Sequence, residues 1–420
     1  MHNKNHSKAL IAMVCLLLVA AAAIGCFVVL SANNQNSSVQ NEGSSSFSTE
    51  ANDTAKLNSQ ENANNENSSN SATDKKASAN ISSESAQAAL DLTQNSTGVC
   101  MVDATNQTQT KISESQLPEL FAAIEAFNTA NSTPTSSSSS NASPEENNNA
   151  ANESNNPPAD NNSADFLQGE ESPDVQQSLD VGFVVYDINT GKGITYNTNS
   201  EFFSASTIKA PFVTSVVQQS DETGTPKFTD KIEEDLYFDG TGTMAYDDET
   251  TYSVEDVLTN TITHSDNVGY ALLRENFNTN NEFEAWCSTA GVDASLWQGV
   301  YYPSYSALDL AKMWLATGSF LTSSSKHAQW LDSLLQTGDL SFIRNVSPEG
   351  SRVLSKAGYE MGAGMNSLND AGVVVTETST YVIAIMSNAP YDDEYYTINQ
   401  DLIENLASEL IAAHDKLLAN

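Results

Sequence analysis

Basic residues are scarce in this 420-residue chain, where 17 Lys and Arg stand against 54 Asp and Glu for a formal net charge of -37. A surface that binds nucleic acid needs clustered Lys and Arg to neutralise phosphates, so the composition excludes DNA and RNA as partners. Such an excess of negative charge keeps a chain soluble and self-repelling, and it favours a location outside the cytoplasm.

Cysteine is also scarce, with four residues in the chain. Cys15 and Cys26 lie in an apolar N-terminal run, which leaves only Cys100 and Cys287 and excludes a disulfide-stabilised scaffold. We expect two unpaired, buried thiols, and a single bridge between them is the alternative. We expect neither a metal nor a cofactor.

Residues 9–30 form an unbroken apolar run that is long enough to span a bilayer as a helix. Lys4 and Lys8 precede the run and no Lys or Arg follows closely, so the positive-inside rule places residues 1–8 in the cytoplasm. The sequence thus predicts a single-pass anchor in a bacterial cell membrane, with the rest of the chain outside. A cleaved signal peptide is one alternative. A lipoprotein is another, because "AAIGC" resembles a cleavage box that ends at Cys26.

Two segments, residues 31–80 and 131–174, are rich in Asn, Ser, Glu and Gln and almost lack aromatic residues. They cannot bury enough apolar area to offset chain entropy, so both are predicted to be disordered spacers. Between them, residues 81–130 are expected to form two short strands within 98–112 and a helix along an apolar stripe: Leu117, Leu120, Phe121, Ile124 and Phe127. A segment this short makes a poor independent core, so we expect it to dock on the main domain.

The composition becomes typical of a globular domain over residues 175–420. Alternating apolar residues predict one hairpin over 181–196 and a second over 371–388. A helix is expected over 206–219, and another begins after a capping box at Ser253. Strands at both ends of a helical middle predict an α+β fold, with one antiparallel sheet flanked by helices and a helical subdomain inserted in it. We expect a monomer.

The stretch "FFSASTIKAPFV" places Ser206 three residues before Lys209 among apolar residues, one helical turn away on the same face. A serine hydroxyl is a weak nucleophile unless a base takes its proton. A lysine can be that base only if burial or another cation lowers its pKa. Because the motif S-x-x-K is weak alone, an exposed helix lysine is the alternative interpretation.

Two further motifs follow in order, S-D-N at residues 265–267 and K-A-G at residues 356–358. The order S-x-x-K, S-D-N, K-x-G resembles that of the penicillin-recognising serine enzymes. Over residues 175–420 the chain looks most like the class A β-lactamase-like serine hydrolases. The resemblance implies the β-lactamase/transpeptidase-like form of the α+β fold.

The resemblance also implies roles for the matching residues. Ser206 would be the acylated nucleophile and Lys209 its base. Ser265 would pass a proton to the leaving nitrogen, and Asn267 would hold Lys209 and the substrate amide. Asp266 is expected to be structural in such a site.

Substrate binding falls, by the same resemblance, to Lys356, Ala357 and Gly358, with the charge of Lys356 attracting a carboxylate. The backbone N–H groups of Ser206 and Tyr359 would form the oxyanion hole. Ala357 departs from the family pattern, since Ser or Thr normally stands there and its hydroxyl helps to bind the substrate carboxylate. No Arg lies on the next predicted strand. Carboxylate binding is therefore expected to be weak.

Class A β-lactamases also need a glutamate, on a loop between the second and third motifs, to activate the deacylating water. The matching stretch here, residues 291–303, has no Glu, and Asp293 is its only acid. The preceding Glu282 and Glu284 are expected at surface positions of a helix. We therefore expect slow deacylation.

The leading hypothesis is a membrane-anchored, extracytoplasmic serine hydrolase or acyltransferase that forms an acyl-enzyme at Ser206. Its substrates would be amides of a peptidoglycan peptide or a β-lactam, and the acyl acceptor, water or an amine, stays open. The alternative is a non-catalytic cell-wall-binding or sensor domain on the same fold. A surface adhesin on a long stalk rests on the spacers alone.

Overall fold

The computed structural model describes residues 83–94, 96–130, 178–234, 238, 240–362, 365–391 and 396–419. All of them belong to one compact unit that runs from Asp74 to Asn420. The predicted anchor over residues 9–30 and the predicted spacers over 31–80 and 131–174 lie outside the described residues. Within the described ranges, no helix is both long and apolar enough to cross a membrane.

A seven-stranded sheet organises the unit, in the order β2-β1-β4-β3-β11-β10-β9, with every neighbouring pair antiparallel. Its strands are Cys100–Asp103 (β1), Thr108–Lys111 (β2), Val181–Asp187 (β3), Lys192–Tyr196 (β4), Arg352–Glu360 (β9), Ser367–Val375 (β10) and Thr380–Ser387 (β11). The first and last parts of the domain meet where β3 pairs with β11, with Phe183 opposite Ile385. The prediction that both hairpins share one antiparallel sheet is confirmed.

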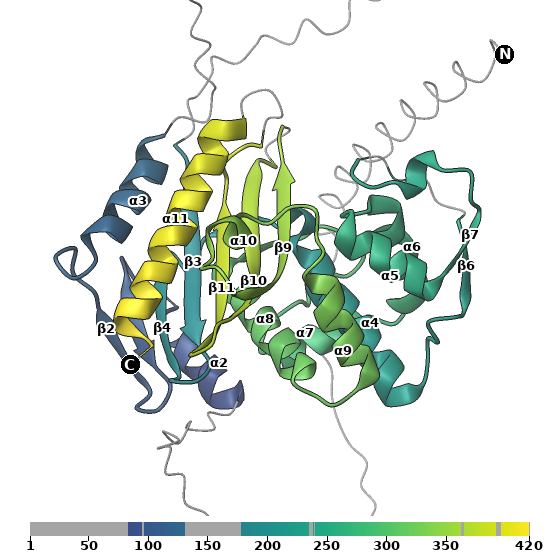
Figure 1. The fold of residues 1–420 in the computed structure, drawn as a ribbon, viewed down its shortest axis with the longest axis horizontal. Helices are drawn as coiled ribbons and strands as arrows, with labels where there is room; N and C mark the ends of the chain where they lie inside the picture. Colours follow the sequence, from purple (N-terminus) through teal and green to yellow (C-terminus); the bar gives the residue numbers. More distant parts are fainter. Residues whose placement is uncertain are drawn as a thin grey trace, which may run out of the picture. The chain divides into compact units, whose positions relative to one another are not determined.

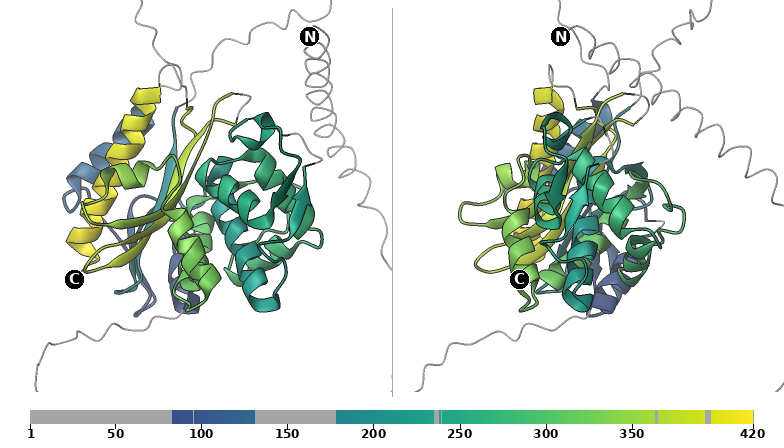
Figure 2. Two further views of the ribbon diagram at one scale, coloured as in Figure 1. Left: turned by 45° about the vertical axis from the view of Figure 1, so that its right-hand side comes forward. Right: turned by 90° about the vertical axis from the view of Figure 1, so that its right-hand side faces the viewer.

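Helices cover both faces of this sheet (Figures 1 and 2). One face carries Pro118–Thr129 (α3), Phe342–Val346 (α10) and Tyr396–Leu417 (α11). The other packs on Ala307–Leu321 (α8), and beyond it lies the helical subdomain. The subdomain consists of Ala205–Ile208 (η1), Lys209–Thr223 (α4), Met244–Tyr246 (η2), Val254–Thr263 (α5), Asn267–Phe277 (α6), Glu282–Thr289 (α7) and Lys326–Leu335 (α9). The expected α+β arrangement with an inserted helical subdomain is confirmed, and the expected capping box at Ser253 begins α5.

Strand β3 shows why a strand that is covered on both faces carries almost no polar residues. Every residue of β3 is buried, because successive side chains point to opposite faces and both faces are covered. Val184 and Tyr186 pack in the apolar cluster shared with α4 and α8. Phe183 and Val185 pack in the second cluster, shared with α3 and α11. The sheet is thus the common wall of two hydrophobic cores.

The segment that precedes β3 extends the sheet. Strand β1 pairs with β4, and β2 completes the edge. A helix that the sequence analysis did not predict, Ser83–Asp91 (α2), packs near α8, where Lys312 Nζ lies 2.5 Å from Asp91 Oδ1. Cys100 and Cys287 are both buried and unpaired, so the interpretation as free thiols is confirmed.

A buried polar cluster joins β3, the β10–β11 turn and α11. His414 Nε2 lies 2.8 Å from Asp187 Oδ2, Ser379 Oγ donates to the same oxygen, and Thr190 N donates to Asp187 Oδ1 at 2.7 Å. Burial alone raises the pKa of Asp187, but the hydrogen bonds from His414, Ser379 and Thr190, with the charge of His414, bring the pKa below its usual value. This carboxylate therefore contributes stability above its unfolded-state pKa, and the contribution is lost as the pH falls through the folded-state pKa.

We expect Asp187→Asn to lower the free energy of unfolding by about 3–5 kcal/mol at neutral pH, because a buried, paired carboxylate is removed. The difference from wild type should shrink below roughly pH 4, where the unfolded-state carboxyl becomes protonated. Urea unfolding at neutral and acidic pH measures both. Asp415→Asn is the matched control, since the exposed Asp415 also contacts His414 and should contribute about 0–1 kcal/mol. Equal losses for the two variants would contradict the prediction.

Candidate active site

The segment around Ser206 enters the helical subdomain through a short 3-10 turn. Ala205 has a left-handed backbone, with φ of 43°, and η1 then continues into α4. Such a backbone is costly for a residue with a side chain, and residues held in it cluster at active sites and ligand clamps. Thr207 Oγ1 donates to Ser204 O at 2.7 Å and also contacts Tyr305 Oη, which holds the turn. Ser206 is half-buried on the wall of a cavity of about 530 Å³.

Lys209 is completely buried, with 0% of its surface exposed. Its Nζ donates to Ser265 O and to Asn267 Oδ1, both at 2.6 Å, and lies 3.4 Å from Ser265 Oγ. The interpretation of Lys209 as an exposed helix lysine is therefore wrong. Within the described residues, however, no hydrogen bond joins Lys209 Nζ to Ser206 Oγ.

The surroundings of Lys209 disfavour its charged form. Burial is the larger cause that brings the pKa of Lys209 well below its usual value, and the positive charge of Lys356 adds to the decrease. The negative charge of Asp266 opposes them only in part. The rings of Tyr270 and Tyr302 lie 5.9 and 5.7 Å from Nζ. Because its pKa is low, the amine of Lys209 can be neutral, and a neutral amine has a lone pair that can accept the proton of a hydroxyl.

Ser265 brings the two lysines together, in a left-handed backbone with φ of 53°. Its Oγ accepts from Lys356 Nζ at 2.9 Å and is also the third contact of Lys209. Burial lowers the pKa of Lys356 to about 8, although Asp370 and Asp339 oppose the decrease. One hydroxyl thus lies between two buried lysines whose pKa values are both lowered, an arrangement that can pass protons.

Strand β9 lies directly against the backbone of η1. A Cβ atom added to Gly358 would lie 2.7 Å from Ser206 N and 2.6 Å from Thr207 N, so only glycine permits this approach. The next residue, Tyr359, lines the cavity together with Ser206. Ala357 belongs to the apolar cluster on the α3 and α11 face and does not line the cavity.

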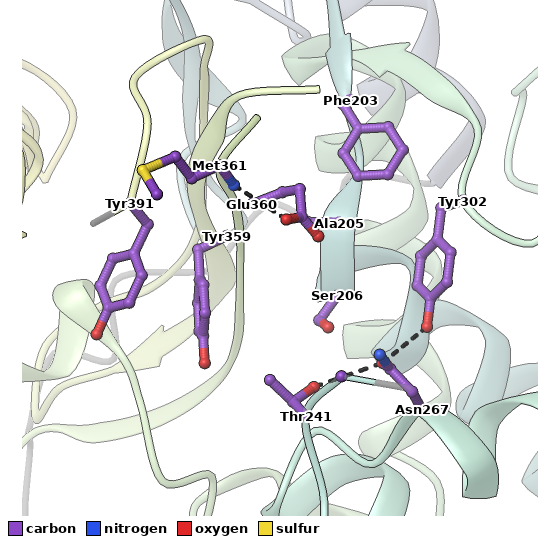
Figure 3. Close-up of a pocket in the computed structure, with 11 residues that line it drawn as sticks. Phe203, Ala205, Ser206, Thr241, Asn267, Tyr302, Tyr359, Glu360, Met361 and Tyr391 are labelled. Atoms are coloured by element: carbon purple, nitrogen blue, oxygen red, sulfur yellow. Dashed lines mark hydrogen bonds between the residues drawn. The ribbon is translucent and has the colours of Figure 1, made fainter. Parts of the chain in front are cut away.

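Ser206, Asn267 and Tyr359 are the predicted site residues that line the cavity (Figure 3). Lys209 and Lys356 do not line the cavity. Lys209 Nζ donates to Asn267, which does line it, and both lysines donate to Ser265. The structure thus gathers the three motifs at one place.

Thr241 is a cavity residue that the sequence analysis missed. Its Oγ1 donates to Ser265 O at 2.6 Å, and Asn267 N donates to Thr241 O at 2.9 Å. Asp266 holds this loop by accepting from Thr243 N at 2.6 Å and Met244 N at 2.9 Å, which confirms its expected structural role. The sequence feature that could have revealed this loop is the Gly-Thr-Gly stretch at residues 240–242, whose glycines both have positive φ.

Tyr302 is a second cavity residue that the sequence analysis missed, and it lies in the stretch 291–303, which has no glutamate. Its Oη donates to Asn267 Oδ1 at 2.9 Å, so an aromatic ring rather than a carboxylate reaches the site from residues 291–303. Asp293 is exposed and accepts from Ser295 N instead. The expectation that Glu284 lies at the surface is wrong. It is buried, and its carboxylate lies 3.6 Å from the buried Arg274 guanidinium of α6.

Comparison with known proteins gives one family match. Residues 172–414 match the model of the beta-lactamase enzyme family. This range extends from just before β3 into α11 and contains the three motifs. A search of curated proteins finds no match.

Solved structures similar to this chain include PBP-A, at 22% identity over 59% of this chain and 93% of that one, with a TM-score of 0.49. A β-lactamase from Sphaerobacter thermophilus has 21% identity over 57% and 92% of the two chains, with a TM-score of 0.47. A β-lactamase from Chitinophaga pinensis has 22% identity over 56% and 93%, with a TM-score of 0.48.

We expect Gly358→Ala to displace Ser206, because the added methyl group forces β9 away from η1, and so to slow any acylation of Ser206 by a β-lactam by about 10²-fold or more. It should also lower the free energy of unfolding by about 1–3 kcal/mol through overpacking. Mass spectrometry of the adduct and thermal unfolding measure these effects. Gly338→Ala is the matched control, since its added Cβ would meet its nearest neighbours at an ordinary 3.9 Å. A fully reactive Gly358→Ala variant would show that this contact is not needed.

Proposed function

Because the chain belongs to the beta-lactamase enzyme family, we propose that it is a serine hydrolase or acyltransferase that forms an acyl-enzyme at Ser206. The observation that carries the proposal is the placement of the Ser265 hydroxyl between buried Lys209 and Lys356, beside a cavity that Ser206 lines. An arrangement that pairs a nucleophile, a low-pKa base and a proton carrier suits acyl transfer.

Acylation begins with the proton of Ser206. A neutral lysine amine has two N–H donors and one lone pair. Ser265 O and Asn267 Oδ1 can only accept, so they take the two donors and leave the lone pair for the hydroxyl proton. As Lys209 Nζ takes that proton, Ser206 Oγ attacks the carbonyl carbon of the substrate amide. The N–H groups of Ser206 and Tyr359 would bind the oxyanion.

Collapse of the tetrahedral intermediate breaks the C–N bond and requires a proton on the leaving nitrogen. Ser265 Oγ supplies its own proton to that nitrogen and recovers one from the Lys209 ammonium. Lys209 is then neutral again and Ser206 carries the acyl group. The positive charge of Lys356, 2.9 Å from Ser265 Oγ, holds this hydroxyl and keeps the pKa of Lys209 low.

Deacylation lacks the base that class A β-lactamases use. Within the described residues, no carboxylate of the stretch 291–303 lines the cavity, and Tyr302 lies there instead. Burial first, with nearby tyrosines and the charges of Asp266 and Glu360, raises the pKa of Tyr302 far above its usual value, so its hydroxyl stays protonated. The acyl-enzyme should therefore be hydrolysed slowly, which also allows an amine to accept the acyl group.

The substrate class that we propose is an amide of a peptidoglycan peptide or a β-lactam. We propose a bacterial extracytoplasmic location, with residues 9–30 as the membrane anchor and a lipoprotein or a secreted protein as alternatives. A non-catalytic cell-wall-binding domain is the second candidate. The burial of two lysines at one hydroxyl argues against it, because burying an ammonium group is costly and binding alone does not require it.

We expect benzylpenicillin to form an adduct on Ser206 at a rate that follows a bell-shaped pH profile. The rate should rise as Lys209 loses its proton and fall through about pH 8 as Lys356 loses its charge. Intact-mass spectrometry over time measures the rate at each pH. Ser206→Ala should form no adduct, and Lys356→Arg, which stays charged, should lose the fall near pH 8. An adduct that persists in Ser206→Ala would sink the proposal.

We expect a chromogenic cephalosporin to give a burst of one equivalent followed by slow turnover. General-base assistance is typically worth about 10²–10⁴-fold, and the absence of the glutamate should slow hydrolysis by a factor of that order. Stopped-flow absorbance separates the burst from the steady state. Asp293→Ala is the control and should behave as wild type, since Asp293 is exposed. Fast multiple turnover in both proteins would overturn this part of the account.

A further inference from the structure

Glu360 ends strand β9 on the wall of the cavity that Ser206 lines. It is the only charged side chain among the described residues that line this cavity. Figure 3 shows its carboxylate on the side of the cavity where Ala205 and Ser206 lie. Glu360 Oε1 accepts from Met361 N at 3.0 Å, and no salt bridge in the described part of the chain involves Glu360.

The register of β9 places Glu360 relative to the proposed chemistry. Successive side chains of a strand point to opposite faces, so residues 356, 358 and 360 share one face of β9. Lys356 and Glu360 are about 13 Å apart along it at about 3.3 Å per residue, with Gly358 midway and against Ser206 N. The nucleophile therefore has a cation toward one end of the strand and an anion toward the other.

The path of the proton to the leaving nitrogen decides whether the leaving group or the acyl group of the substrate lies toward Lys356. Ser265 gives its proton to the leaving nitrogen and is hydrogen-bonded to Lys356, so the leaving group lies toward Lys356. The acyl part must then extend along β9 toward Glu360. A negative carboxylate at that end attracts a cation and repels an anion.

A second hollow shares Phe203 with this cavity and is also lined by Met365 and Asn366, next to Ser367, which pairs with Glu360. It is lined by Asp180 and Glu201, and within the described residues no Lys or Arg lines it. The acyl end of the proposed substrate path thus offers carboxylates and no cation to an approaching group.

We propose that Glu360 is a specificity-determining residue that selects acyl donors with an ammonium group on the acyl side of the scissile amide. The proposal rests on acyl-enzyme formation at Ser206. It names the substrate as an amide whose two ends differ in charge, with a cation on the acyl part and an anion on the leaving part.

Three penicillins with one acyl skeleton test this inference. Benzylpenicillin has an uncharged acyl group, ampicillin adds an α-amino group, and carbenicillin adds an α-carboxylate. Acylation efficiency is measured for each by adduct mass at low ionic strength and at a pH where the amine is protonated. The proteins are wild type, Glu360→Gln and the control Glu349→Gln, which changes an exposed carboxylate away from the cavity.

Relative to Glu360→Gln, wild type should favour ampicillin over benzylpenicillin and benzylpenicillin over carbenicillin, by about 1.5- to 5-fold at each step. Glu360→Gln should compress the ratio of ampicillin to carbenicillin toward that of their intrinsic reactivities, and Glu349→Gln should leave it unchanged. Because each penicillin is compared between proteins, differences in intrinsic reactivity cancel. Added salt should compress the wild-type ratio as well.

Three results would overturn the inference. Adducts that form at ratios equal in wild type and Glu360→Gln would remove the role of Glu360 and leave the proposed function standing. Unchanged ratios with slower adduct hydrolysis in Glu360→Gln would make Glu360 a base for deacylation instead. No adduct with any penicillin would overturn both the inference and the proposed function.

Discussion

The burial of the Lys209 amine is the constraint on which the rest of the site depends. An ammonium group taken out of water costs several kcal/mol even after relaxation, so an unexposed lysine stays charged only where it is well compensated. Here the compensation is two oxygen atoms, Ser265 O and Asn267 Oδ1, each 2.6 Å from Nζ. A second cation, Lys356, lies at the same Ser265 hydroxyl and works against it. The fold thereby makes a base out of a residue that is ordinarily an acid.

Two features, the missing side chain of Gly358 and the carboxylate of Asp266, keep this amine between the sheet and the helical subdomain. The absence of a side chain at Gly358 lets β9 lie against the turn that carries Ser206. On the subdomain side, Asp266 caps α6 and holds the loop of Thr241 through backbone N–H groups. The site therefore lies between the sheet and the helical subdomain. Strand β9, on the sheet side, also carries Lys356 and Glu360.

The sequence predicted what depends on local pattern. The hairpin over β3 and β4, the helix α5 with its capping box, and the three motifs were all readable, because strand alternation, capping and motif spacing are local signals. It could not predict that Tyr302 contacts Asn267 or that Glu284 pairs with Arg274, since these contacts arise when distant segments pack. The resemblance implied that Asn267 holds Lys209, and the 2.6 Å hydrogen bond confirms it, but it did not reveal that, among the described residues, Lys209 makes no hydrogen bond to Ser206.

The protonation state of Lys209 is the central claim, and its titration tests that claim most directly. Lysine labelled with ¹³C at the ε-carbon gives one NMR signal per residue, and comparison with Lys209→Met assigns the signal of interest. The account predicts a midpoint well below the value of about 10.4 for an exposed lysine, because burial and Lys356 both lower the pKa of Lys209. A midpoint near 10.4 would contradict the account, since Lys209 would then be charged at neutral pH and unable to take the proton of Ser206.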